Sequence, residues 1–229
     1  YRDNNQEQKA RPMLLELFDN NTVELGSKLI VLGSYNGEIN KNKSKGISDP
    51  EKETFALTLF EKLKNGNLAD PSVHILGGDL YLSMGRNRDA QSEYLRAIES
   101  GEVNFEVWEN LLYLETQLEQ FDNVIKHSES ALELFPNQSM IHYFNGFAHL
   151  RKRHYPEAIA SLEQAKKLSG SNPKLAGELS GMLGDAYNAT KAYDKSDKAY
   201  EDALAINPNN DAVLNNYSYY LALRKTSLD

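Results

Sequence analysis

Residues 177–210 read GELSGMLGDAYNATKAYDKSDKAYEDALAINPNN, and this stretch decides the fold. Apolar residues recur at helical spacing in each half, and the polar segment between the halves indicates a turn, so the 34 residues predict a helix-turn-helix unit. Counted from Gly177, positions 7, 8, 11, 24, 27 and 32 are occupied by Leu183, Gly184, Tyr187, Tyr200, Ala203 and Pro208. These six positions provide a register that can be tested along the rest of the chain.

The register recurs before and after this unit. Counted from Pro71, Gly78 falls at position 8 and Tyr94 at position 24, and counted from Ser139, Gly146 falls at position 8. The predicted organisation is a degenerate helical region, 1–70, followed by units at 71–104, 105–138, 139–172 and 173–210 and a partial unit at 211–229.

Glycine inside a helix costs about 1 kcal/mol relative to alanine, so its return at position 8 predicts close helix packing. The small residue lets two backbones approach, and the aromatic at position 24 fills the space beside it. The spacing from Gly146 to Gly184 is 38 residues instead of 34, because Pro173 to Ala176 are extra. Four residues make about one helical turn, so we expect Asn172 to cap a helix that opens at Pro173, one turn early.

These positions and this period make the chain resemble the tetratricopeptide repeat (TPR) family. The resemblance implies an all-α fold, a right-handed superhelical α-α solenoid of helix-turn-helix repeats. The segments WENLLYLE (Trp108 to Glu115) and LNNYSYYLALR (Leu214 to Arg224) are similar to C-terminal repeats of longer bacterial TPR proteins. This second likeness implies a multi-repeat scaffold, often preceded by further repeats and an export signal, and no defined activity.

The region before Pro71 matches the register poorly. Helices are expected over Lys9 to Phe18, Val23 to Tyr35 and from Pro50 to about Lys64, after a frayed polar start. Residues 36–49, NGEINKNKSKGISD, are rich in Gly, Asn, Lys and Ser, and predict an exposed loop.

The composition argues against several functional classes. A net charge of -8 does not suit nucleic-acid binding, which depends on clustered Lys and Arg. With no cysteine, the chain has neither disulfides nor thiol nucleophiles. Runs of consecutive apolar residues, such as Leu29 to Leu32, are far shorter than a membrane span.

The sequence contains no motif that predicts catalysis or cofactor binding. HExxH, GxSxG, P-loop and GxGxxG patterns are absent. His142 and His149 are seven residues apart and can share a helix face, but no further ligands accompany them, so a packing or surface role is expected. We therefore predict a non-enzymatic protein without metal or cofactor.

In the TPR family the first helices of the repeats line a concave surface that commonly holds a peptide. Positions 2, 5, 9 and 12 face that surface, which implies as partner-binding residues Asp79, Glu106, Glu109, Tyr113, Tyr143, Phe147, Glu178, Asp185, Asn188, Asn215 and Tyr219. Family members that clamp a carboxylate use Lys and Asn at positions 5 and 9, and Lys and Arg at positions 2 and 6 of a later repeat. In this chain Asn110 is only a near match to that pattern, so a carboxylate clamp is not expected. Acids beside aromatics suit a partner segment with basic and apolar residues. Phe147 has an equally good interpretation as packing between units.

Two alternatives stay open. The partial unit from Asp211 would expose Leu214, Tyr217 and Leu221 and so favour a homodimer, and the chain would equally serve as the regulatory arm of a larger enzyme. Because it starts at Tyr1 instead of Met, we expect a piece of a longer protein. The bacterial resemblance fits an exported or periplasmic location better than a cytoplasmic one.

Overall fold

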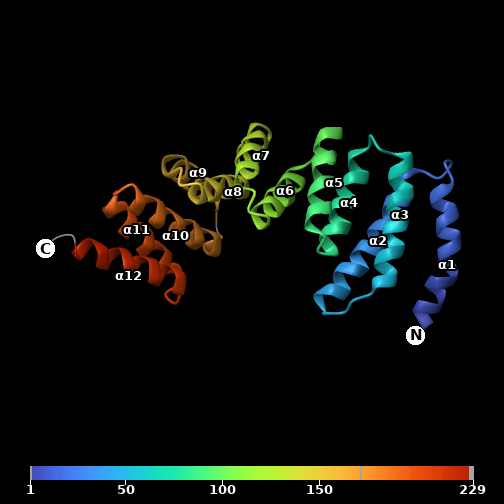
Figure 1. Ribbon diagram of the computed structural model, residues 1–229, viewed down its shortest axis with the longest axis horizontal. Coiled ribbons are helices and arrows are strands. Elements are labelled where there is room, and N and C mark those ends of the chain that lie inside the picture. Colours follow the sequence, from blue (N-terminus) through green and yellow to red (C-terminus); the bar gives the residue numbers. More distant parts are fainter. Residues whose placement is uncertain (1, 171, 227–229) are drawn as a thin grey trace. The chain divides into compact units, whose positions relative to one another are not determined.

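The computed structural model describes residues 2–170 and 172–226, and within them the regular structure is entirely helical (Figure 1). Twelve helices are described: α1 (Arg2–Asp19), α2 (Leu25–Ser44), α3 (Pro50–Gly66), α4 (Pro71–Ser83), α5 (Asn87–Ser100), α6 (Phe105–Gln117), α7 (Phe121–Leu134), α8 (Ser139–Arg151), α9 (Tyr155–Leu168), α10 (Pro173–Ala189), α11 (Tyr193–Ile206) and α12 (Asp211–Thr226). The predicted all-α repeat architecture is confirmed. Residues 227–229 of the predicted last unit lie outside the described part.

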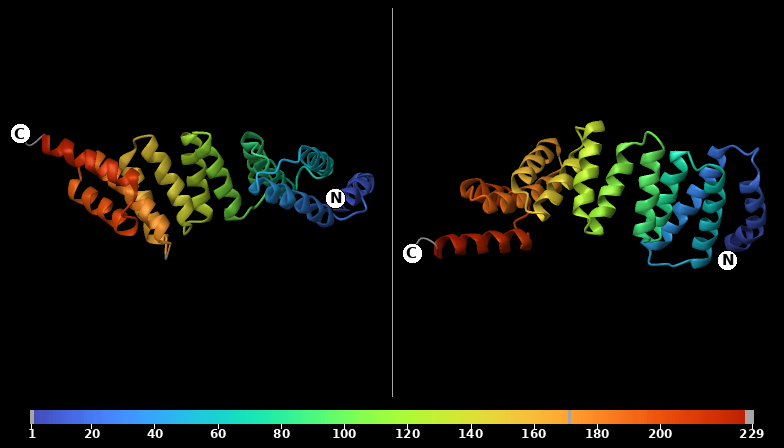
Figure 2. Two further views of the ribbon diagram at one scale, coloured as in Figure 1. Left: turned by 90° about the horizontal axis from the view of Figure 1, so that it is seen from below. Right: turned by 45° about the horizontal axis from the view of Figure 1, so that its top comes forward.

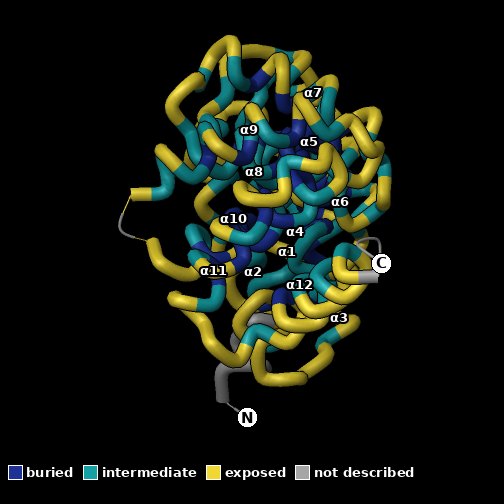
Figure 3. Tube along the Cα trace, turned by 90° about the vertical axis from the view of Figure 1, so that its left-hand side faces the viewer, coloured by how far each residue is buried: buried dark blue, intermediate teal, exposed yellow. Residues whose placement is uncertain are grey.

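The chain divides into two compact units, Tyr1–Val107 and Trp108–Asp229. In the second unit, α8 packs antiparallel to α9 and α10 packs antiparallel to α11, as Figure 2 shows. The first helix of each pair also contacts the preceding pair, so α8 contacts α7 and α10 contacts α9. Buried positions gather where these helices face one another, whereas the turns are exposed (Figure 3).

The glycines of the repeat register make room for an aromatic ring or a leucine from the second helix. A Cβ atom at Gly184 would lie 2.6 Å from the ring of Tyr200, and one at Gly78 would lie 2.6 Å from the ring of Tyr94. At Gly146 the close neighbour is instead the side chain of Leu162, at 2.7 Å. Carbon atoms normally approach to about 3.5–4.0 Å, so position 8 tolerates no side chain in these pairs.

The start of α10 agrees with the four extra residues in the sequence. The side-chain oxygen of Asn172 accepts a hydrogen bond from the backbone N–H of Leu175 at 3.1 Å, and Pro173 occupies the first turn. Before this cap, Gly170 has a φ of +58°, in the left-handed region that glycine adopts without strain. Asp49 caps α3 in the same way, ahead of Pro50.

Two expectations for the first unit are wrong. Residues 36–44 of the predicted exposed loop 36–49 are helical, because α2 continues to Ser44. Its buried stripe of Leu32, Tyr35 and Ile39 has helical spacing, and this tertiary packing outweighs the weak helix propensity of the Gly and Asn residues between. The first helix also begins earlier than predicted, at Arg2 instead of Lys9.

A polar cluster replaces the aromatic residue of position 24 in the 105–138 unit. Ser128 stands at that position, and its hydroxyl accepts a hydrogen bond from the Asn145 amide at 2.8 Å. Ser161 in turn donates to the Asn145 oxygen at 2.5 Å. Both Ser128 and Asn145 are buried, so the cluster links α7, α8 and α9 while satisfying the polar groups that it buries.

Candidate functional site

Two of the predicted partner-binding acids are held by a tyrosine of their own repeat. The Tyr200 hydroxyl donates to Asp185 Oδ1 at 2.5 Å, and the Tyr94 hydroxyl donates to Asp79 Oδ1 at 2.6 Å. Burial raises the pKa of both carboxyl groups, although the tyrosine hydrogen bonds act in the opposite direction. The aspartate at position 9 therefore has a structural role, because it holds the closely packed tyrosine at position 24.

In the second unit, Asp185 borders a cavity of about 290 Å³ between α8, α10 and α12, which we call the groove cavity. Its lining residues are Tyr143, Phe147, Glu178, Gly181, Met182, Asp185, Tyr200, Asn210, Ala212, Val213 and Asn216. It thus contains predicted positions from two first helices, α8 and α10. These four predicted residues, Tyr143, Phe147, Glu178 and Asp185, are brought together within this unit.

One wall of the groove cavity is aromatic. The rings of Tyr143 and Phe147 stack with centroids 6.3 Å apart and an interplanar angle of 3°. Phe147 also meets the ring of Phe121 edge-on at 6.1 Å, and the guanidinium of Arg151 lies 4.6 Å over Phe121. Phe147 is therefore both a packing residue and part of the cavity wall. The stack keeps this wall rigid, which lowers the entropy cost of binding against it.

The facing side is acidic. Among the described residues that line the groove cavity, Glu178 and Asp185 are carboxylates and none is Lys or Arg. Oδ1 of Asp185 also accepts from the Asn216 amide at 3.1 Å, and no hydrogen bond from a described residue reaches its Oδ2. Burial, and then the charge of Glu178, raises the pKa of the Tyr143 hydroxyl. The cavity therefore offers negative charge beside aromatic surface.

The other predicted residues lie outside this cavity. Asn188 is half-buried on α10, whereas Asn215 and Tyr219 are exposed on α12. Glu109 and Tyr113 lie on α6 of the second unit, and Tyr113 is 46% exposed. Asp79 and Glu106 belong to the first unit.

The cavity also uses residues that the sequence register missed. Asn216, one residue after the predicted Asn215, contacts Asp185 and lines the cavity. Ala212 and Val213 come from the first turn of the same helix. Ala212 is at position 2 of the register, but an alanine side chain does not by itself indicate a binding role. Asn216 is at position 6, which faces the preceding repeat in this structure.

The described helices contain neither a metal centre nor a membrane span. Within residues 2–170 and 172–226, no three His, Cys, Asp or Glu side chains converge to hold an ion. No helix in the same ranges is long and apolar enough to cross a bilayer.

Comparison with known proteins identifies the repeat family. The tetratricopeptide repeat model matches residues 75–139 and 145–211, together more than half of the chain. A TPR repeat-containing protein of Methanocaldococcus jannaschii is 26% identical over 144 residues, 62% of this chain. The chain spans only about a quarter of that relative, 25% of its length.

Solved structures share the fold at low sequence identity. YrrB, a TPR protein with an unusual peptide-binding site, superposes with a TM-score of 0.65 at 17% identity, over 80% of this chain and 90% of YrrB. The MamA protein gives a TM-score of 0.64 at 15% identity, over 79% of this chain and 92% of MamA. With the family match over more than half of its residues, the chain belongs to the tetratricopeptide repeat family.

Proposed function

We propose that this protein is a noncatalytic scaffold that binds a segment of a partner protein in the groove cavity, and that the segment carries basic and apolar residues. TPR proteins are in general protein-interaction scaffolds, and the peptide-binding site of YrrB supports a peptide as the ligand. The observation that carries the proposal is the rigid Tyr143–Phe147 wall opposite two carboxylates.

The two sides of the cavity have different roles in this proposal. The aromatic wall supplies contact area at little entropic cost, because its rings are already stacked. Glu178 is exposed, and no described residue forms an ion pair with it, so its carboxylate is available to a Lys or Arg of the partner. A volume of about 290 Å³ is at the lower limit of small-molecule pockets, which suits one anchoring side chain.

Asp185 is a poor choice for a charge-reversal experiment. A lysine in its place would lose the hydrogen bonds from Tyr200 and Asn216, so reduced binding would be confused with lost packing. Glu178 has no such role, and Tyr143 is only half-buried. The groove variant is therefore Tyr143→Ala combined with Glu178→Lys.

A control variant on another surface of the second unit also truncates one side chain to alanine and reverses one negative charge. Leu134→Ala combined with Glu133→Lys removes one exposed apolar side chain, 62% exposed, and reverses one exposed charge on α7. In pull-downs from the source cells, proteins retained by the wild type should be retained by the control and lost with the groove variant. If the groove variant retains them as well, the groove cavity is not the binding site.

Self-association through α12 is a second candidate. Tyr219 is 59% and Leu223 47% exposed on this helix, and because they are four residues apart they share one face, which supports an apolar surface there. Of the residues expected at this edge, Tyr217 instead stacks on Tyr200 with ring centroids 5.0 Å apart. Sedimentation at increasing concentration should give a dimer that Tyr219→Glu with Leu223→Glu disrupts, and a wild type that stays monomeric at high concentration would exclude it.

A further inference from the structure

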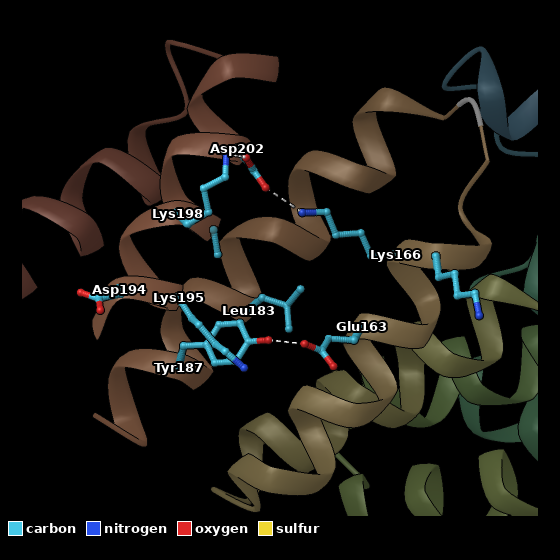
Figure 4. Close-up of a pocket in the computed structure, with 10 residues that line it drawn as sticks. Glu163, Lys166, Leu183, Tyr187, Asp194, Lys195, Lys198 and Asp202 are labelled. Atoms are coloured by element: carbon cyan, nitrogen blue, oxygen red, sulfur yellow. Dashed lines mark hydrogen bonds and ion pairs between the residues drawn. The ribbon is translucent and has the colours of Figure 1, made fainter. Parts of the chain in front are cut away.

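The opposite face of α10 borders a second and larger cavity of about 570 Å³, which we call the lysine cavity (Figure 4). It is lined by residues of α9, α10 and α11, namely Glu163, Lys166, Lys167, Leu183, Tyr187, Asp194, Lys195, Lys198, Ala199 and Asp202. None of these residues lines the groove cavity. The helix α10 thus separates two cavities with different linings.

Two polar links join the helices around the lysine cavity. Lys166 of α9 forms an ion pair with Asp202 of α11 at 3.1 Å, and the Tyr187 hydroxyl of α10 donates to Glu163 of α9. Figure 4 shows these links at separate places, with the Leu183 side chain close to Tyr187. The space between them is bounded by positioned side chains on three helices, so it can hold a ligand side chain with little rearrangement.

The base of the lysine cavity is apolar and firmly packed. Leu183, Tyr187 and Ala199 are buried members of one hydrophobic cluster. The hydroxyl of Tyr187 is already engaged with Glu163, and the Lys195 ammonium lies over the Tyr187 ring, which leaves Leu183 and the uncovered part of that ring as the surfaces for contact. An entering apolar side chain would meet well-ordered carbon surface here.

The rim has more positive than negative side chains, four lysines against three acids. Asp202 is shared by Lys166 and Lys198, the latter at 2.8 Å. Hydrogen bonding from Lys198 first, and then from Lys166, lowers the pKa of the Asp202 carboxyl. Figure 4 also shows Asp194 pointing away from Tyr187.

Two of the lysines have no acidic partner in the described part of the chain. The ammonium of Lys195 lies 5.4 Å from the ring centroid of Tyr187, and neither Lys195 nor Lys167 forms an ion pair with a described carboxylate. Both side chains are exposed, so a carboxylate from outside can reach them without displacing an internal salt bridge.

We propose that the lysine cavity binds an acidic protein segment that carries a large apolar side chain. The apolar side chain contacts Leu183 and the part of the Tyr187 ring that Lys195 leaves uncovered, and flanking carboxylates pair with Lys195 and Lys167. The charge complementarity is opposite to that of the groove cavity. One repeat pair therefore offers a site for a basic segment on one face of α10 and a site for an acidic segment on the other.

A peptide fits this cavity better than a nucleic acid. Nucleic-acid binding requires an extended series of unpaired basic side chains, whereas here two lysines are shared with Asp202 and the chain as a whole carries a net charge of -8. The apolar base also favours a peptide over a simple anion, because only the peptide has an apolar side chain to place there.

The test is the equilibrium binding of a fluorescein-labelled peptide, Gly-Glu-Glu-Phe-Glu-Glu-Gly, to the complete 229-residue chain, followed by anisotropy. The variant Lys167→Glu with Lys195→Glu should weaken binding by about tenfold or more, because two charge-assisted contacts become repulsive. Replacing the peptide phenylalanine with alanine should weaken binding by a similar factor of about ten. Raising the salt from about 50 mM to about 300 mM should also weaken it.

The control variant is Lys126→Glu with Lys174→Glu, which changes the net charge equally at exposed lysines on α7 and α10. It should bind the peptide within about twofold of the wild type, because only general charge attraction is lost. Glu178→Gln, at an exposed residue of the groove cavity outside the hydrophobic cluster, should change peptide binding by less than about twofold and so separates this site from the proposed function. Equal weakening by both lysine pairs, or equally tight binding of a twenty-nucleotide thymidine strand that competes with the peptide, would overturn the proposal.

Discussion

Substituting alanine at two glycines of α10 should change stability in opposite directions. Either substitution removes the conformational cost of glycine in a helix, a gain of about 1 kcal/mol. At Gly177 the new Cβ atom would lie 3.4 Å from Ile206, an ordinary contact, so Gly177→Ala should stabilise the protein by up to about 1 kcal/mol. At Gly184 the new atom would lie 2.6 Å from the Tyr200 ring, well inside the contact distance.

The Tyr200 ring cannot move away from a side chain at Gly184. It is fully buried, its hydroxyl is held by Asp185, and it is stacked on Tyr217 with ring centroids 5.0 Å apart. Overpacking of this kind costs about 3 kcal/mol at the upper end of the usual range, and subtracting the helix gain leaves a net loss of about 2 kcal/mol. The two variants should therefore differ by about 3 kcal/mol.

Urea unfolding followed by circular dichroism measures this difference directly. The expected result is a lower midpoint for Gly184→Ala and a higher one for Gly177→Ala, with unchanged slopes. If both variants are stabilised to the same extent, the ring of Tyr200 does not occupy the space beside Gly184, and the explanation of the repeat register is refuted.

Three further predictions concern titratable groups. Tyr94→Phe should destabilise the protein by about 2 kcal/mol in urea unfolding, because it removes a partly buried hydrogen bond to a carboxylate, and it should raise the pKa of Asp79 further. Because burial raises the folded-state pKa of Asp185 above the ordinary 3.8, its contribution to stability is present below pH 3.8 and is lost as the pH rises through the folded-state value. In a series of melting temperatures measured against pH, Asp185→Asn should not show this loss of stability. Identical pH profiles for the variant and the wild type would contradict a raised pKa at Asp185. Burial first, and then His154, lowers the pKa of His149 below 6.5, so its contribution to stability is present above pH 6.5 and is lost as the pH falls through the folded-state value. In an NMR titration His154→Gln should move the His149 pKa toward 6.5 without reaching it, and an unchanged pKa would exclude coupling between the two rings.

The repeat core was predictable because its defining contacts are local. Gly184 and Tyr200 are only 16 residues apart, and their types and spacing recur in Gly78 and Tyr94. The early start of α10 followed from Asn172 and the proline after it, since capping depends on adjacent residues. Sequence reasoning works well where geometry is determined within one helical pair.

The chemistry of the site was harder to predict, because it depends on which side chains meet across helices. Position 9 indicated an exposed acid at Asp185, but the hydroxyl of Tyr200 reaches it from the second helix of the same repeat. Lys166 and Lys198 border one cavity although 32 residues separate them, and their spacing corresponds to no motif. The extension of α2 through 36–44 was missed because local composition favoured a loop, whereas buried Ile39 required a helix.

Occupation of the groove cavity by a partner can be detected by photo-crosslinking. A benzophenone amino acid placed at Ala212, an exposed residue of the cavity lining, would face the bound segment. The same probe at Ala205, an exposed residue of α11 outside the lining of both cavities, serves as the control. We expect a covalent adduct at Ala212 with a partner segment rich in Lys or Arg, and none at Ala205. An adduct at Ala205 without one at Ala212 would contradict this expectation.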